Sequence, residues 1–126
     1  MGETLRNRYE FGRWLRGHAL DIAQPDVART GITEAMAVAE LCAASHIPVA
    51  PHHSVGLGVS LAAGLHVAAA VEDLLVFEYQ PTSTEVGRRI LRTPLDVRPD
   101  HFPLPAGPGL GIDVDERVVR DLAGKD

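Results

Sequence analysis

Three ionisable side chains, Asp26, His52 and Glu78, each follow a short apolar run of the sequence. In parallel α/β folds, catalytic and binding residues gather at the carboxyl ends of the strands. If these runs are neighbouring strands, Asp26 lies within reach of His52. A carboxylate that accepts one imidazole N–H fixes the tautomer and makes the other nitrogen a base suited to neutral pH. The alternative is an aspartate that caps a helix and pairs with a surface histidine.

Three further residues are candidates for a part in the same chemistry. His53 competes with His52, because side chains alternate along a strand and only one of the two can point inward. Glu78 follows four apolar residues and could act as an acid or pair with an arginine. Glu3 carries the oxygen ligand that Mg²⁺ prefers, although one carboxylate does not make a metal site.

Helical and strand-like patterns alternate along the first part of the chain. Three helices are predicted in this part: one over about 5–17, a second that begins after Thr33 as its N-cap, and a third over about 57–70. The apolar side of the first helix is predicted to consist of Leu5, Tyr9, Phe11, Trp14 and Leu15. Short apolar strands are predicted at 19–23, 47–50 and 74–77, the first ended by a proline that cannot donate to a ladder. Such runs are typical of strands covered by helices on both faces. The order therefore predicts an α/β fold with a parallel sheet or barrel.

After Tyr79 the pattern changes. Residues 80–111 are rich in proline and glycine, which predicts irregular extended chain, and a short polar helix is predicted at about 115–122. Three parallel strands cannot close a barrel, which needs eight strands and usually about 250 residues. Their apolar edge would be open to pairing. The chain is therefore a fragment, a smaller open sheet, or a core completed by association.

Composition excludes several classes of protein. The chain has 126 residues, a net charge of −5 and 45% apolar residues, as expected for a soluble globular protein. A cluster of arginines near the start is interpreted as a solvated helix face, not a nucleic-acid footprint. No run is long enough to span a bilayer and no signal peptide is evident, so no membrane contact and a cytoplasmic location are expected. Cys42 lies in an apolar helical pattern and should be buried and inert. The remaining histidines, including His66, are expected in solvated or capping roles.

Five stretches, taken in order, carry a family pattern. They are Met1-Gly2-Glu3, Gln24-Pro25-Asp26-Val27-Ala28-Arg29-Thr30-Gly31-Ile32-Thr33-Glu34-Ala35, Val49-Ala50-Pro51-His52, Phe77-Glu78-Tyr79 and Pro105-Ala106-Gly107-Pro108-Gly109-Leu110-Gly111-Ile112-Asp113. They resemble the mandelate racemase and muconate lactonizing enzyme branch of the enolase superfamily, and are most similar to the C-terminal part of acid-sugar (galactonate-type) dehydratases. The resemblance covers nearly the whole chain.

The resemblance implies a fold and a set of roles. Residues 1–79 would be the C-terminal part of a (β/α)₈ TIM-type barrel, about three βα units from the end of the fifth strand to the eighth. Residues 80–126 would be an irregular extension that packs on a capping domain. Glu3 would bind Mg²⁺, Asp26 and His52 would form a His–Asp dyad, and Glu78 would be an acid that donates a hydrogen bond to the substrate carboxylate.

The implied reaction removes the proton α to the carboxylate of a small substrate such as an acid sugar. Loss of a β-hydroxide then gives a dehydratase, and reprotonation gives a racemase or epimerase. The Pro51-His52 context and the Thr30–Glu34 run favour the dehydratase.

Two departures from the family pattern limit this expectation. The family commonly has two glycines before Ile-Thr, whereas Thr30-Gly31 supplies one. The capping domain, the lysine base motif and two of three metal carboxylates are not in these residues, and the single lysine is Lys125. The chain alone is therefore expected to be inactive and to associate through its open strand edge or form a homo-oligomer. The alternatives are a non-catalytic remnant or binding protein, and, more weakly, an independent open α/β domain.

Overall fold

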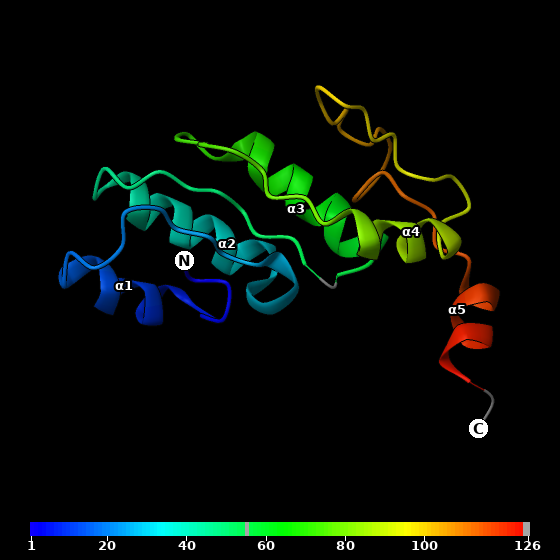
Figure 1. Ribbon diagram of the computed structural model, residues 1–126, viewed down its shortest axis with the longest axis horizontal. Coiled ribbons are helices and arrows are strands. Elements are labelled where there is room, and N and C mark those ends of the chain that lie inside the picture. Colours follow the sequence, from blue (N-terminus) through cyan, green and yellow to red (C-terminus); the bar gives the residue numbers. More distant parts are fainter. Residues whose placement is uncertain (55, 125–126) are drawn as a thin grey trace.

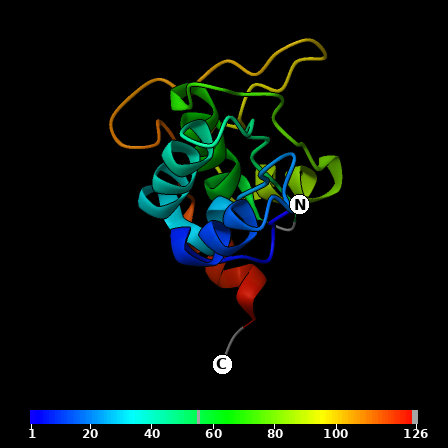
Figure 2. The ribbon, with the colours of Figure 1, turned by 90° about the vertical axis from the view of Figure 1, so that its left-hand side faces the viewer.

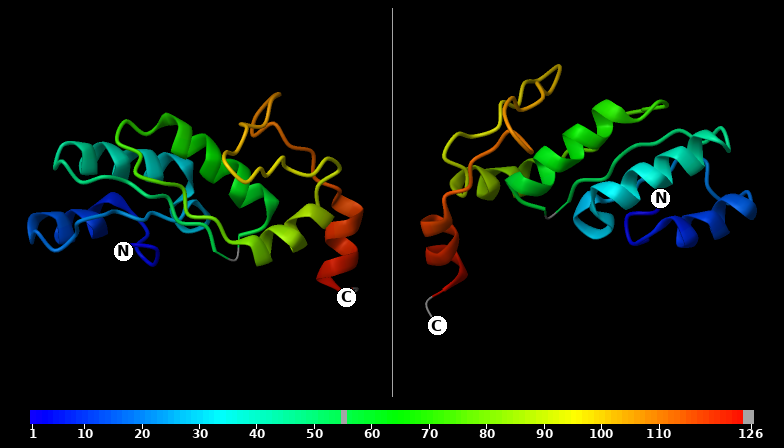
Figure 3. Two further views of the ribbon diagram at one scale, coloured as in Figure 1. Left: turned by 45° about the horizontal axis from the view of Figure 1, so that its top comes forward. Right: turned by 180° about the vertical axis from the view of Figure 1, so that it is seen from behind.

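The computed structural model describes residues 1–54 and 56–124. Its helices are α1 (Arg8–Arg16), α2 (Val27–Ala43), α3 (Gly58–Ala70), α4 (Pro81–Arg89) and α5 (Glu116–Ala123). Helices α1, α2 and α3 lie side by side, and the extended segments that connect them run along one face of this layer (Figure 1, Figure 2). The chain after α4 forms long loops, and α5 projects away from the layer (Figure 3).

The extended segments pair in parallel but only at isolated positions. Bridges join Ala23 to Val49, Asp26 to His52, and Val49 to Leu74. The predicted boundaries of the first strand, 19–23, were wrong, because pairing begins at Ala23 and continues through Pro25 to Asp26.

Two prolines explain why the ladders are interrupted. Pro25 and Pro51 each accept a hydrogen bond through the carbonyl, from His52 N (3.0 Å) and Glu78 N (3.1 Å). Neither has an N–H to donate, so each leaves one ladder bond unmade. A proline at these positions weakens the pairing without ending it, and the segments remain in register up to the residues predicted to do chemistry.

One face of the paired segments packs on the helices and the other is open. The packed face belongs to a core cluster: Phe11, Leu15, Leu20, Ala23, Val38, Ala39, Cys42 and Val49. On the open face, Ile22 and Val76 keep 38% and 56% of their surface exposed. It carries a cavity of about 430 Å³ whose lining includes Gln24 and Ala50. The expectation that helices cover both faces was therefore wrong for the described residues; in a barrel this open face is the interior.

Helix α1 is shorter than predicted and turned differently. It begins at Arg8, because the side chain of Asn7 caps it by accepting hydrogen bonds from Tyr9 N and Glu10 N. Phe11 and Leu15, four residues apart, are buried as predicted. Tyr9 and Trp14 were wrongly assigned to the apolar side: they are 76% and 43% exposed, because the helical phase that buries Phe11 and Leu15 turns both outward.

Helix α2 begins at Val27, not at Thr33, because the carboxylate of Asp26 caps it by accepting a hydrogen bond from Ala28 N. Gly31 interrupts the helix with φ 72° and ψ 166°, a backbone conformation that residues with a side chain rarely adopt. Just after this break, Glu34 binds Arg8 (Nη2–Oε1 2.6 Å), which ties α2 to the start of α1. Hydrogen bonds from the Arg8 side chain and backbone hold the pKa of Glu34 below its usual value.

Helix α3 matches its prediction, and α4 was missed. The proline and glycine content of 80–111 predicted irregular chain, but Pro81–Arg89 is helical. Pro81 stands in the first turn, where its lack of an N–H costs nothing, and the Gln80 side chain caps the helix by accepting from Thr82 N. Proline therefore starts a helix here instead of breaking one. The rest of the segment is irregular, and α5 confirms the predicted short helix.

The C-terminal segment is fastened to the body at Leu110. This side chain packs against a second cluster, formed by Val27, Ala35, Ala63 and Val67 of α2 and α3. His66 of α3 donates through Nε2 to the Leu110 carbonyl (3.2 Å). The expectation that His66 is solvated or a cap was therefore wrong, because it holds the tail to α3.

Two predictions from composition can be compared with the structure. Cys42 is fully buried, and burial raises the pKa of its thiol to about 11. This confirms a buried cysteine, whose small thiolate fraction makes it unreactive. In the described residues, no helix combines the length and the apolar character needed to cross a membrane. Lys125 lies outside the described residues.

The contact between α4 and α3 leads to a stability prediction. A Cβ on Gly87 would stand 2.6 Å from the backbone nitrogen of Gly58, which cannot move without shifting α3. We expect Gly87→Ala to lower the free energy of unfolding by about 1–3 kcal/mol, measured by urea denaturation. The matched control is Gly12→Ala in α1, where the new Cβ meets side chains alone: the flexible guanidinium of Arg16 (3.2 Å) and, at ordinary van der Waals distance, Leu41 (3.6 Å). Equal stability of the two variants would contradict the close packing of α4.

Candidate active site

The centre of the candidate site is a hydrogen bond between His52 and Asp26. His52 Nδ1 lies 2.8 Å from Asp26 Oδ2. Asp26 is 4% exposed, and the side chain of His52 is 16% exposed. An ionised carboxylate can only accept, so Nδ1 carries the hydrogen and Nε2 of the neutral ring keeps its lone pair. The pair therefore presents one basic nitrogen on the open face.

The backbone brings these two side chains together. Asp26 and His52 form a parallel bridge, and His52 N donates to the Pro25 carbonyl. The other carboxylate oxygen of Asp26 accepts from Ala28 N (2.8 Å) at the start of α2. The two alternatives for Asp26, helix cap and histidine partner, thus hold at once, with one oxygen for each. The His52 side chain is largely buried, so the expectation of a surface histidine does not fit.

His53 points to the opposite face, as strand alternation requires. It is 2% exposed, and its Nε2 donates to the Gly56 carbonyl (2.8 Å). Its ring lies 6.3 Å from the rings of both Phe77 and Tyr79. Phe102 from the C-terminal segment packs on the same two rings. His53 is therefore part of a packed aromatic cluster, and His52 is the histidine available for chemistry.

Glu78 lies on the open face beside the free nitrogen of His52. Its Oε1 is 4.0 Å from His52 Nε2, and its Oε2 accepts a hydrogen bond from Gln24 Nε2 (3.1 Å). The run before it is not buried: Leu75 and Val76 are more than half exposed. Within the part of the chain that the structure describes, Glu78 binds this glutamine and no arginine.

Gln24 is the site residue that sequence reasoning missed. The signal was present, because Gln24 stands two residues before Asp26 and side chains two apart share one face of a strand. Gln24 itself was noted only as part of a family motif. The structure shows Gln24 as the link between the Asp26 segment and Glu78.

Glu3 stands apart from this network. Its carboxylate accepts from the backbone N–H of Gly2 (3.0 Å). The pKa of Glu3 is lower than its usual value, chiefly because its own backbone N–H donates to the carboxylate. Burial opposes this shift, whereas the Gly2 N–H, the chain's amino terminus and the charge of a protonated His52 add to it. The group is thus suited to be an anionic oxygen ligand. Among residues 1–54 and 56–124, however, no three acidic, histidine or cysteine side chains are grouped to hold a metal.

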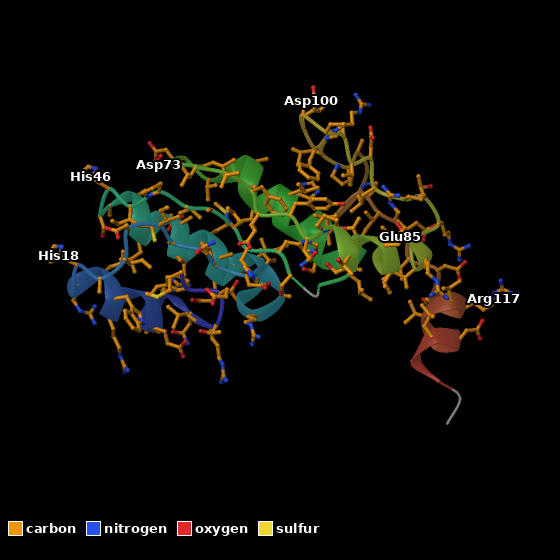
Figure 4. The ribbon with its side chains drawn as sticks, in the orientation of Figure 1. His18, His46, Asp73, Glu85, Asp100 and Arg117 are labelled. Atoms are coloured by element: carbon orange, nitrogen blue, oxygen red, sulfur yellow. The ribbon has the colours of Figure 1, made fainter. Side chains whose placement is uncertain are left out.

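The site lies toward the end where the paired segments finish. His18, His46 and Asp73 mark the turns at which the three segments start, at the end of the molecule far from α5 (Figure 4). His18 and His46 adopt positive φ angles of 50° and 56° and close the turns after α1 and α2. Asp26, His52 and Glu78 are therefore grouped at the carboxyl ends of the segments, where parallel α/β folds place reactive groups.

Known proteins resemble this chain in sequence and in fold. A family model described as Enolase C-terminal domain-like matches residues 1–118. The arabinonate dehydratase of Saccharolobus solfataricus is 33% identical over 98% of this chain and 33% of its own length. The D-galactonate dehydratase of Klebsiella pneumoniae is 33% identical over 97% of this chain and 34% of its own.

A solved structure agrees. A member of the enolase superfamily from Agrobacterium tumefaciens superposes with a TM-score of 0.86 and 33% identity, over 94% of this chain and 30% of that one. The chain thus spans about a third of the length of the relatives it matches. The predicted resemblance is confirmed, and the chain belongs to the enolase C-terminal domain-like family of the enolase superfamily.

Proposed function

We propose that these residues form the histidine side of the active site of an acid-sugar dehydratase. The observation that carries this proposal is the hydrogen bond from His52 Nδ1 to Asp26, which leaves Nε2 as a base on the open face beside Glu78. Relatives named as arabinonate and D-galactonate dehydratases support the substrate class. The proposal extends to a whole protein longer than the chain.

In the proposed reaction, His52 Nε2 accepts the proton α to the substrate carboxylate. The C–H electron pair moves into the carboxylate, which becomes an enediolate, and Asp26 stabilises the imidazolium that forms. The enediolate then returns its electrons to form a C=C bond as hydroxide leaves the β-carbon. Glu78, in its protonated form, donates a hydrogen bond to the substrate carboxylate. Racemisation would begin with the same proton abstraction, but the names of these relatives favour elimination.

A metal ion would stabilise the enediolate charge, which is the chemistry Mg²⁺ supplies in such reactions. Glu3 offers one suitable oxygen ligand. The residues in the described ranges do not form a complete site around it, so they do not fit a bound ion by themselves. No step above is therefore assigned to a metal.

Two exposed surfaces support further parts of the proposal. Leu75 and Val76 lie exposed on the last of the paired segments, so we propose that another part of the barrel, or a second copy, pairs with that segment. Helix α5 has no buried residue, and its Val119 and Leu122 are 38% and 43% exposed. An apolar stripe on a projecting helix fits packing against a capping domain.

The function can be tested in two arms. We expect the purified chain alone to show no Mg²⁺-dependent dehydration of arabinonate or galactonate. We also expect activity from a chimera in which this chain replaces the matching third of the Saccharolobus solfataricus arabinonate dehydratase. His52→Asn should then lower kcat of the chimera by at least about 100-fold, as expected for loss of a general base.

Unaltered arabinonate dehydratase is the positive control, and His46→Asn, at a turn far from the site, is the matched variant. Turnover by the chain alone that disappears in His52→Ala would contradict the first arm. A chimera whose kcat is the same with and without His52 would contradict the second.

The double role of Asp26 yields a separate prediction. Asparagine caps helices as well as aspartate, so Asp26→Asn should keep the stability of the chain, whereas Asp26→Ala should lose about 0.5–2 kcal/mol. Both should lower kcat of the chimera. In Asp26→Asn the amide can face Nδ1 with its N–H, which favours the tautomer with hydrogen on Nε2 and removes the base.

Urea denaturation and kcat of the two variants check this together. A stable Asp26→Asn chimera with undiminished kcat would show that Asp26 acts only as a cap.

A further inference from the structure

Gln24 is positioned to control the side chain of Glu78. It lies on the open face, two residues before Asp26. Its backbone N–H donates to the Met1 carbonyl (3.0 Å), so its main chain is fixed within the parallel pairing. Its side-chain oxygen accepts from the amino group of Met1, which orients the amide. The Nε2 group is therefore the end that faces Glu78, at 3.1 Å from Oε2.

The side chain of Glu78 has little else to hold it. Its backbone is anchored, because Glu78 N donates to the Pro51 carbonyl (3.1 Å). Its side chain is 44% exposed and has three rotatable torsions, so it would populate several rotamers without a partner. The hydrogen bond from Gln24 selects the rotamer in which the other oxygen, Oε1, lies 4.0 Å from His52 Nε2.

The chemistry of an amide donor matters here. A neutral N–H can donate both to a carboxylate and to the carbonyl oxygen of a carboxylic acid, although the bond to the carboxylate is stronger. Because the carbonyl oxygen is the better acceptor of a carboxylic acid, the bond from Gln24 to Oε2 favours the proton of a protonated Glu78 on Oε1, the oxygen that faces His52. A carboxylate at position 24 would repel Glu78, and an ammonium group would favour only the ionised form.

We propose that Gln24 is a positioning residue that fixes the Glu78 carboxyl group and directs its proton to Oε1. The consequence rests on the proposed function of His52 and Glu78, while the contact itself does not. Gln24 thereby determines which of the two oxygens meets the substrate carboxylate.

The test is nuclear magnetic resonance of the full chain. Side-chain scalar couplings report the Glu78 rotamer, and a nuclear Overhauser contact reports its distance from the His52 ring. We expect a single rotamer and a visible contact in the wild-type chain. In Gln24→Met, which keeps length but removes the donor, the couplings should average and the contact should be lost. Gln24→Glu should lose the contact as well.

The matched control is Gln80→Met. Gln80 is the other glutamine of the chain, two residues from Glu78, and its side chain caps α4 instead of binding Glu78. It should leave the Glu78 rotamer and the His52 contact unchanged. A Glu78 rotamer that stays fixed in Gln24→Met would overturn the proposal, as would an equal loss in Gln80→Met.

A second measurement does not depend on the folding of a Gln24 variant. The side-chain amide resonances of Gln24 should shift in Glu78→Leu and stay in place in Glu72→Leu. No shift in Glu78→Leu would overturn the proposal. In every Gln24 variant the His52 Nδ1 proton should still show its bond to Asp26. A chimera whose kcat does not depend on His52 would refute the proposed function but would leave the Gln24 contact unaffected, so the two failures are distinguishable.

Discussion

The arrangement of the whole site depends on one buried carboxylate. Asp26 uses one oxygen to start α2 and the other to hold the imidazole of His52. The bond to His52 requires the Asp26 segment to lie parallel to the His52 segment in a single register, whereas the bond to Ala28 is local to the start of α2. Pro25 and Pro51 reduce the ladder bonds that would otherwise fix that register. The carboxylate therefore compensates at the point where the backbone pairing is weakest.

Alternation along the paired segments divides the neighbouring residues into two functions. On the open face, His52 and Glu78 meet, with Gln24 beside them. On the packed face, His53 lies between the aromatic rings that flank Glu78, and Phe102 of the C-terminal segment packs on those rings. The packed cluster ties the two segments together directly behind the reactive side chains. The polar face thus gains part of its geometry from the apolar cluster packed behind it.

Sequence reasoning found the parts of this fold that depend on periodicity and on strand ends. The order of elements, α3, α5 and the meeting of Asp26 with His52 followed from those signals. Sequence reasoning failed where proline can occupy either a break or a regular element. Pro81 starts a helix and Pro25 lies within a paired segment, whereas both were interpreted as breaks.

Three other errors also have physical causes. Apolar strands look alike whether their second face is covered by helices or by the rest of a barrel, so the open face of Val76 was not foreseen. Thr33 and Asp26 are both good caps, and the choice between them depends on Gly31, whose positive φ lets the helix resume after a break. Gln24 was missed because its role is a contact 54 residues away in the sequence.

The most direct test of this account is the protonation of the His52 ring nitrogens. Nitrogen-15 resonance of the chain should be recorded at alkaline pH, so that the imidazole ring is neutral. The account predicts a hydrogen on Nδ1, a bare Nε2, and loss of this preference in Asp26→Asn. A hydrogen found on Nε2 in the wild-type chain would contradict it, because no base would then face the substrate.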